Sequence, residues 1–150
     1  MPEASRSDPR PHTDLPPRMA TFRLRRQTSR WALFAEVIVQ AEQADEYQAV
    51  LGTDVYAWRR SIYGPNAFFG GAYDEELCSA ASDGARYALR HLPESAAKTR
   101  IRIVEIVESM ADTTAEAVKF ATAHAVWTVL GLEPDSPPWI DQEGNAHFPD

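Results

Sequence analysis

The stretch that decides the fold is RIRIVEIVESMADTTAEAVKFATAHAVWTVLG, residues 100–131. Its first part alternates charged and branched apolar side chains, a pattern that predicts a β-strand over residues 100–108. The alternation places the first two isoleucines on one face and Val104 and Ile106 on the other. The stretch therefore supplies a strand and, after it, a helix.

The second part of the stretch predicts that helix. Thr113 and Glu116 have the spacing of a capping box, in which the threonine hydroxyl accepts from the backbone N–H of Glu116 and the glutamate reaches back. Apolar residues then recur on one helical stripe, and Gly131 ends the helix. The stripe consists of Ala117, Val118, Ala121, Ala125, Val129 and Leu130.

An earlier segment predicts another amphipathic helix. Asp74 is expected to be its N-cap, glutamates follow at the positive end of the helix dipole, and Pro93 lies just beyond its end. Each of the two helices needs a sheet face to cover. The apolar positions of this helix, at helical spacing, are Leu77, Ala80, Ala81, Gly84, Ala85, Ala88 and Leu89.

The N-terminal half predicts the rest of the sheet. Period-two alternation indicates one strand over residues 22–41, and the aromatic-rich segment 55–63 indicates a second strand before a turn at Gly64. Residues 43–52 between them are expected to be a connector with a short helical turn. The predicted order is β-β-α-β-α, an α+β two-layer sandwich whose sheet is covered on one face by two helices.

The two ends of the chain differ from the body, residues 21–132. Residues 1–20 contain five prolines among polar residues and are expected to be a disordered arm. Residues 133–150 form a proline-rich tail with five acidic and no basic residues. Within this tail, residues 139–148 could form a short hairpin packed on the body, and a tail that hangs free is the alternative.

Composition limits the class of protein. The chain has 150 residues, of which 44% are hydrophobic and 25% charged, as in an ordinary one-domain globular protein. A single cysteine allows no internal disulfide, the N-terminus lacks a secretory apolar run, and no stretch is apolar enough to span a membrane. We therefore expect a cytoplasmic protein without membrane contact. The net charge of −7 disfavours nonspecific polyanion binding, but five of the acidic residues lie in the tail, which leaves room for a local basic contact.

Three segments, in order along the chain, carry a family resemblance. Residues 25–37, RRQTSRWALFAEV, match a run R-x-Q-T-G-G-x-G-Q-[FY]-A-x-V, and residues 70–84 match G-G-x-I-P-x-E-Y-x-x-A-V-x-x-G. Residues 112–121, DTTAEAVKFA, match D-S-S-E-x-A-F-K-x-A. These runs are similar to the first strand pair and the starts of the two helices in domain four of elongation factor G. The resemblance spans roughly residues 22–131 and implies a fold of the ribosomal protein S5 second-domain type, here as a stand-alone domain.

The departures from that family concern the two loops with which its domain enters the ribosomal decoding site. Ser29, Arg30 and Ala32 occupy the glycine positions of the first loop, and residues 108–112 form a shorter second loop without its histidine. The chain also lacks the G-x-x-x-x-G-K-[ST] phosphate cradle of a GTPase. The resemblance therefore implies a binding domain without translocase activity, not an enzyme.

The surface feature with the clearest chemistry is a basic cluster beside an aromatic residue. Its members are Arg23, Arg25, Arg26, Arg30 and Trp31. Arginine forks bind phosphate and aromatic rings stack on bases, so the cluster predicts a contact with nucleic acid or with a partner protein. The other interpretation is a solvated strand edge, whose charges prevent edge-to-edge pairing. Arg59 and Arg60, on the predicted second strand, could extend either one.

Paired carboxylates are a further possibility, at Glu105 and Glu108 with Asp112. No nucleophile or base can be named beside them, so Glu105 is expected to form a salt bridge with Arg102 or Arg100. Aromatic residues are expected mostly in the core, with any exposed subset forming a protein-binding patch. They are Tyr56, Trp58, Tyr63, Phe68 and Phe69.

The cysteine and histidines have structural interpretations. Cys78 could be a thiolate activated by the helix N-terminus, but a small buried hydrophobe is the expected role. His12 falls in the arm, and His124 is expected to be a half-buried packing residue between Phe120 and Trp127. Neither H-x-x-x-H nor H-E-x-x-H spacing occurs, so no metal and no cofactor is predicted.

Two functions from different classes follow. The first is a non-catalytic binding domain that contacts RNA, the ribosome or a translation component through the arginine cluster. The second is a protein-interaction or regulatory module unrelated to translation, homo-oligomeric or with another partner, which uses the exposed sheet face and its aromatics. A third, a small enzyme with a pocket between sheet and tail, lacks a visible catalytic pair. A pocket lined by Glu105 with a raised pKa would support it.

Overall fold

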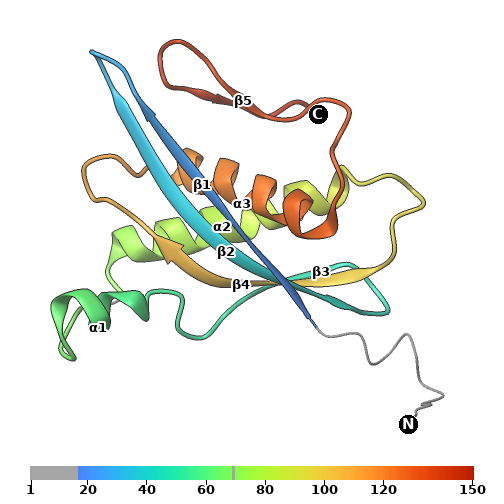
Figure 1. Ribbon diagram of the computed structural model, residues 1–150, viewed down its shortest axis with the longest axis horizontal. Coiled ribbons are helices and arrows are strands. Elements are labelled where there is room, and N and C mark those ends of the chain that lie inside the picture. The colour runs from blue at the N-terminus through green and yellow to red at the C-terminus, as the bar shows by residue number, and fades with distance from the viewer. Residues whose placement is uncertain (1–16, 69) are drawn as a thin grey trace, which may run out of the picture.

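The computed structural model describes residues 17–68 and 70–150, and its centre is a four-stranded sheet (Figure 1). The strands are β1 (Arg18–Gln27), β2 (Ala32–Gln43), β3 (Gln48–Leu51) and β4 (Thr99–Val107), in the spatial order β1-β2-β4-β3. Strands β1, β2 and β4 pair antiparallel, and β3 runs parallel to β4. The parallel pair requires a long crossover, which the helical segment between β3 and β4 provides.

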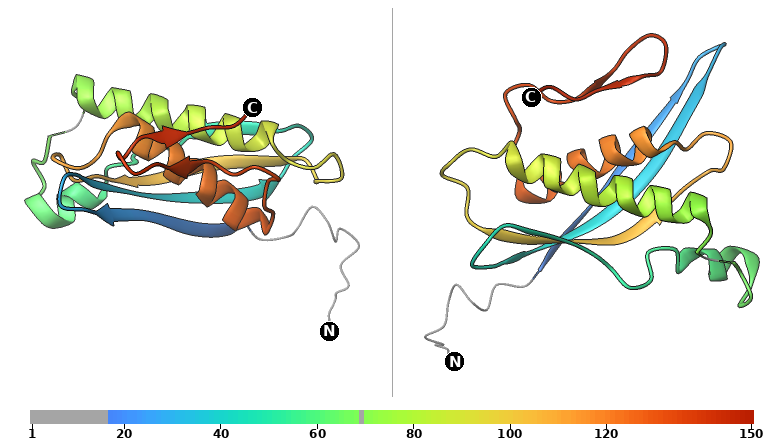
Figure 2. Two further views of the ribbon diagram at one scale, coloured as in Figure 1. Left: turned by 90° about the horizontal axis from the view of Figure 1, so that it is seen from above. Right: turned by 180° about the vertical axis from the view of Figure 1, so that it is seen from behind.

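Two helices cover one face of this sheet, α2 (Ala72–Arg90) and α3 (Ala115–Leu130), as Figure 2 shows. A short helix, α1 (Trp58–Tyr63), lies at one end of the molecule. The α+β two-layer arrangement with two helices on one face is therefore confirmed. The observed element order differs from the predicted one in the N-terminal half, where β1, β2, β3 and α1 take the place of the two predicted strands, and it ends with a C-terminal hairpin. In the described part of the chain, no helix is long and apolar enough to cross a membrane.

The core lies between the sheet and the two helices. Side chains from alternate positions of β2 and β4 are fully buried against helix residues such as Leu77 and Val118. In β4 the alternation breaks, because Ile38 pairs with Glu105 while Val39 pairs with Ile103. This β-bulge inserts one residue and reverses the side-chain phase, so the isoleucines of β4 all face the core. The prediction that they divide between two faces was therefore wrong.

The predicted strand over residues 22–41 is instead a hairpin, β1 turning into β2. The Thr28 hydroxyl accepts from the backbone N–H groups of Arg30 and Trp31, both at 3.1 Å, and its own N–H donates to the Trp31 carbonyl. This turn contains no glycine, proline or asparagine, and the hydroxyl of Thr28 supplies the local hydrogen bonds instead.

The predicted strand over 55–63 was also wrong, because residues 58–63 form α1. Tertiary contacts hold this short helix: the indole N–H of Trp58 donates to the Ile106 carbonyl at 2.6 Å, and Arg59 enters a buried ion-pair network. The strand parallel to β4 lies instead in the expected connector. After this strand the chain turns but stays against β4, where the Gly52 N–H donates to the Ile103 carbonyl and the Ile106 N–H donates to the Val55 carbonyl.

Both helices start beside the predicted caps. Helix α2 has Gly71 as its N-cap, and Asp74 lies within the first turn with a buried carboxylate. Helix α3 is capped by Thr114, whose hydroxyl accepts from the Ala117 N–H at 3.1 Å. The neighbouring Thr113 hydroxyl joins two segments instead, because it accepts from the Ser109 N–H and donates to the Phe34 carbonyl. The ends at Arg90 and at a left-handed Gly131 agree with the predictions.

The tail packs on the body as a hairpin, the first of the two alternatives. Strands β5 (Trp139–Ile140) and β6 (Ala146–His147) pair antiparallel, and Ile140 is buried. The Tyr87 hydroxyl donates to the Pro149 carbonyl. At the other end, residues 1–16 of the predicted arm, with His12, lie outside the described residues. Strand β1 begins at Arg18, so the body starts before residue 21.

Candidate functional site

The predicted arginine cluster lies on the β1–β2 hairpin, which projects beyond the helices (Figure 1). Side chains alternate along a strand, so Arg23 and Arg25 point to the uncovered sheet face while Arg26 points to the helix-covered face. Arg30 lies in the turn. The structure therefore spreads the cluster around a protruding hairpin instead of gathering it on one surface. We call Arg25, Arg26 and Arg30 the hairpin arginines.

The members of the cluster differ in charge balance. The Nε of Arg23 donates to the Glu36 carboxylate at 2.8 Å, so this arginine is largely neutralised. Within the described part of the chain, no carboxylate forms an ion pair with a hairpin arginine, and all three are exposed. Positive charge available to a ligand is thus concentrated toward the tip of the hairpin.

Trp31 belongs to the packing of the tail. Its indole N–H donates to the Gln142 carbonyl at 2.8 Å. Gly144 lies so close to the indole that a Cβ there would be 2.9 Å from the ring. A groove of about 570 Å³ separates the two hairpins and is lined by Arg26, Trp31 and the tail residues Ile140 to Gln142. The expected role of Trp31 as a contact residue is therefore limited, because much of its ring is committed to the tail.

A second aromatic surface escaped sequence reasoning. The rings of Trp139 and His147 stack at 4.3 Å across the tail hairpin, and Trp139 is 53% exposed. His147 Nε2 pairs with Asp141 at 2.7 Å, and the pKa of this carboxyl is lowered, first by the His147 hydrogen bond and then by the Asn145 N–H. In the sequence, a tryptophan and a histidine flank a short turn. This pattern indicates a hairpin but does not predict that the two rings stack on an exposed surface.

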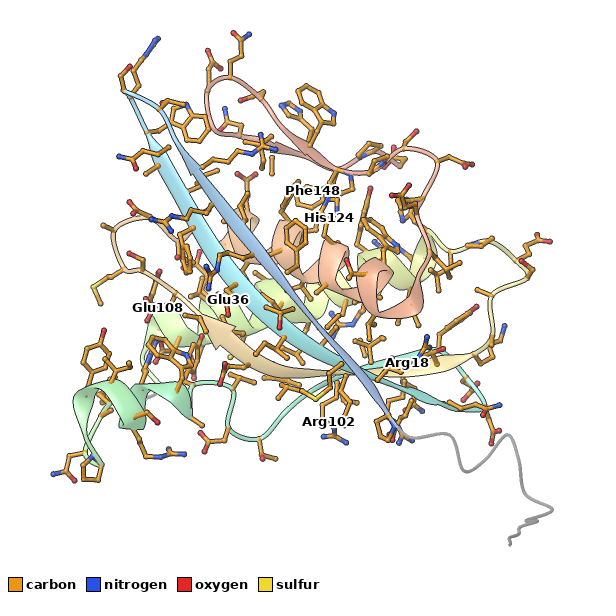
Figure 3. All side chains as sticks on the ribbon, viewed as in Figure 1. Arg18, Glu36, Arg102, Glu108, His124 and Phe148 are labelled. Carbon is orange, nitrogen blue, oxygen red and sulfur yellow. The ribbon has the colours of Figure 1, made fainter. Side chains whose placement is uncertain are left out.

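At the end of the molecule occupied by α1 lies a buried ion-pair network. The Arg59 guanidinium binds Asp74 through two hydrogen bonds of 2.7 and 2.8 Å and Glu108 through one of 2.9 Å. It also lies over the Tyr56 ring, 4.1 Å from its centre. The hydrogen bond from Arg59 lowers the pKa of Asp74, and a further N–H from Gly70 does the same. The network joins α1, α2 and the end of β4, where Figure 3 places Glu108.

This network corrects two expectations. Arg59 is not on a surface strand but is 8% exposed and engaged with two carboxylates. Glu105 pairs with neither expected arginine: Arg100 pairs with Glu42 at 2.7 Å, and no ion pair among the described residues joins Arg102 to Glu105. Burial and the nearby charge of Glu36 raise the pKa of Glu105. The raised pKa is thus found, but Glu105 lies on the uncovered sheet face, not between sheet and tail.

A groove of about 640 Å³ opens above the ion-pair network, and we call it the end groove. Asp74, Arg59 and Glu108 lie at its floor, and the side chains of Tyr63, Phe68 and Met110 stand at its rim. These rim side chains are 70%, 74% and 81% exposed, respectively. Part of the aromatic set is thus exposed, whereas Tyr56 is buried and Phe69 lies outside the described residues.

Cys78 and His124 behave as packing residues. Burial raises the pKa of the Cys78 thiol, the opposite of what an activated nucleophile needs, and its Sγ lies 3.8 Å from the Tyr56 hydroxyl. His124, labelled in Figure 3, stacks on Phe22 at 4.9 Å and lies 4.5 Å from the Phe120 ring, measured between ring centres. Burial lowers its pKa. Among residues 17–68 and 70–150, no three potential ligands from His, Cys, Asp and Glu gather as a metal site would require.

Comparison with known proteins adds information on the fold alone. No protein-family model and no curated protein matches the sequence. Among solved structures, the chain is similar to the crystal structure of a protein from Thermus thermophilus, with a TM-score of 0.54 and 14% sequence identity. The match covers 77% of this chain and 16% of that one, so the chain corresponds to a small part of the other protein. At 14% identity, the likeness shows that the two proteins share a fold, and no function is transferred from it.

Proposed function

We propose that this chain is a non-catalytic binding domain, related to domain four of elongation factor G, that contacts RNA, the ribosome or a translation component in the cytoplasm. The observation that carries the proposal is a protruding hairpin with three exposed arginines that no carboxylate in the described residues neutralises. A guanidinium donates two parallel hydrogen bonds to a phosphate, and a narrow hairpin can enter a groove that a flat sheet cannot. The ordered sequence resemblance provides independent support.

The chain's overall acidity shapes the expected binding. With a net charge of −7, long-range attraction to RNA is weak, so affinity must come from short-range contacts at the hairpin. Such binding depends on salt, because each phosphate contact releases counterions. It also favours a specific RNA shape over any polyanion, since the hairpin presents its arginines on different faces.

The test is a triple variant, Arg25→Gln with Arg26→Gln and Arg30→Gln, titrated with single-stranded RNA and sedimented with ribosomes. We expect the variant to bind RNA and ribosomes more weakly than the parent. The slope of log K against log salt concentration should become about 2 less steep, which is the value for three lost phosphate contacts on a single strand. The control replaces Arg86, Arg90 and Arg18, which changes the net charge equally elsewhere. Unchanged binding by the hairpin variant, or an equal loss in the control, would reject the proposal.

A second candidate is a protein-interaction module that uses the uncovered sheet face. Ile38 lies on this face between the buried Val37 and Val39, and Met19 on the edge strand is 57% exposed. Within residues 17–68 and 70–150, no helix covers this face (Figure 2). Uncovered apolar side chains on a sheet often mark an interface between copies. Light scattering of the parent protein and of Ile38→Lys, together with a cross-linked pull-down, tests this. A dimer that the variant reduces to a monomer supports the module, and a monomeric parent protein without a cross-linked partner rejects it.

A further inference from the structure

Exposed apolar side chains are concentrated at one end of the molecule. The described residues include seven large hydrophobic side chains that are exposed, and Tyr63, Phe68 and Met110 among them line the end groove. They come from three separate segments, namely α1, the loop before α2 and the loop after β4. Ile62, 66% exposed, extends the apolar surface along α1. Convergence of this kind marks an interaction site more often than isolated exposed residues do.

The floor of the end groove is anionic. Two carboxylates, Asp74 and Glu108, share one guanidinium, so the group keeps a charge of −1. Arg59 uses two donors on Asp74 and one on the Oε1 atom of Glu108. Glu108 therefore receives only a single hydrogen bond from this arginine, and its side chain is 10% exposed at the groove floor.

The charge also affects the groove wall. The pKa of the Tyr73 hydroxyl is raised, first by burial and then by the negative charge of Glu108. The opposite effect of the Arg59 charge on this pKa is smaller. A ligand with a positive group near Glu108 would complete the charge balance, whereas a phosphate would be repelled. This separates the end groove from the hairpin arginines, which favour anions.

We propose that the end groove binds a protein segment that carries an apolar side chain next to a lysine or arginine. The apolar side chain lies between the rings of Phe68 and Tyr63 and the thioether of Met110, which adapts to different shapes. The basic side chain reaches Glu108. A protein segment fits better than a small molecule, because small ligands are enclosed by their sites and these rim side chains stand 70% to 81% exposed.

The test uses a displayed library of random twelve-residue peptides, selected on the intact chain. We expect enriched peptides to pair an aromatic or aliphatic residue with an adjacent lysine or arginine. A chosen peptide is synthesised with its basic residue changed to glutamate, and its affinity should fall about tenfold or more, as at a hot spot. Enrichment of acidic peptides, or affinity that ignores the basic residue, would overturn the proposal.

Location is tested with Phe68→Ser and Met110→Ser together. Both side chains are on the surface, so the variant should keep the parent's unfolding midpoint while binding the peptide about tenfold or more weakly. The matched control is Met19→Ser with Trp139→Ser, which removes exposed apolar side chains elsewhere. An equal loss in the control would place the site outside the groove. RNA binding by the hairpin is measured on the same variants, and it should remain unchanged, so the two proposals fail separately.

Discussion

At the residue scale, Arg59 is a buried charged group with two largely buried carboxylate partners. Its side chain is 10% exposed and holds two carboxylates that are equally buried. Such a network costs desolvation energy, so its net contribution to stability is small compared with the cost of breaking it. Its structural role is to fix three elements, α1, α2 and the end of β4, in one arrangement around the end groove.

Replacing Arg59 by methionine should therefore destabilise the protein strongly. The substitution leaves Asp74 and Glu108 buried without a counter-charge, a loss of about 3–5 kcal/mol in the free energy of unfolding. The control is Arg60→Met, since Arg60 pairs with Asp54 where the two side chains are 41% and 49% exposed, and exposed pairs contribute about 0–1 kcal/mol. Urea unfolding of the two variants measures the difference. Equal losses would contradict the network's role.

His124 makes stability depend on pH. Burial lowers its pKa in the folded protein below the ordinary value of 6.5, so the unfolded chain binds a proton more readily. The free energy of unfolding should therefore decline as pH falls below about 6.5, and recover fully above it. His124→Leu should show a weaker decline between pH 7.5 and 5.5, measured by urea unfolding, than the parent or an exposed-site control, His147→Gln. Parallel curves for all three would reject this role of His124.

At the scale of elements, periodicity predicted those with one buried face. Helix α2 and strand β4 carry such a pattern, and their limits agree closely with the predicted ones. Helix α3 is buried on most sides, and its limits were given instead by the threonines before it and by Gly131. Helix α1 was missed because its aromatic residues favour a strand. The helix is fixed instead by tertiary contacts, namely the ion pair of Arg59 and the hydrogen bond of Trp58. Periodicity missed the turn at Thr28, because a single hydroxyl, and no glycine, forms it, whereas the family resemblance implies a loop at Ser29 to Ala32.

The α2–α3 contact offers an element-scale prediction at Gly84. A Cβ there would lie 2.5 Å from the Lys119 carbonyl oxygen and 3.0 Å from the Thr122 Cβ, so the helices approach closely only because the side chain is absent. Gly84→Ala raises intrinsic helix propensity by about 1 kcal/mol, but overpacking costs about 1–3 kcal/mol. We expect a net loss of stability in urea, whereas Ser79→Ala on the exposed face of α2 should not lose any. A more stable Gly84→Ala would contradict the close packing.

At the scale of the whole molecule, sequence reasoning found one candidate surface and named only part of another, since it expected an exposed subset of the aromatics but did not locate it. The hairpin arginines are neighbours in sequence, so a local basic cluster was visible, although its division between two faces required the strand to be known. The end groove is assembled from separate stretches of the chain that no local pattern joins. Its lining residues are Arg59, Tyr63, Ala67, Phe68, Gly71, Tyr73, Asp74, Glu108, Ser109 and Met110. Its carboxylates were noticed separately, and only the fold brings Asp74 to Glu108 through Arg59.

The distribution of charge gives the last prediction, which separates local from overall electrostatics in RNA binding. Glu143 lies in the turn of the tail hairpin, between Gln142 and Gly144, both in contact with Trp31 on the arginine hairpin. Glu133 lies at the start of the tail, beside a different groove with His91. Glu143→Lys and Glu133→Lys therefore change the net charge by the same amount, the first close to the arginine hairpin and the second farther from it. Charges act over about 8 Å at physiological ionic strength, so only Glu143→Lys should strengthen RNA binding appreciably.

This comparison is measured by titrating both variants and the parent with the same single-stranded RNA at two salt concentrations. The gain from Glu143→Lys should shrink as salt rises, because the added contact is screened. Equal gains from both variants would mean that net charge alone controls binding and would remove the argument for the hairpin. A gain confined to Glu143→Lys would place the RNA near the hairpin tip, where the acidic tail then acts as a restraint on affinity.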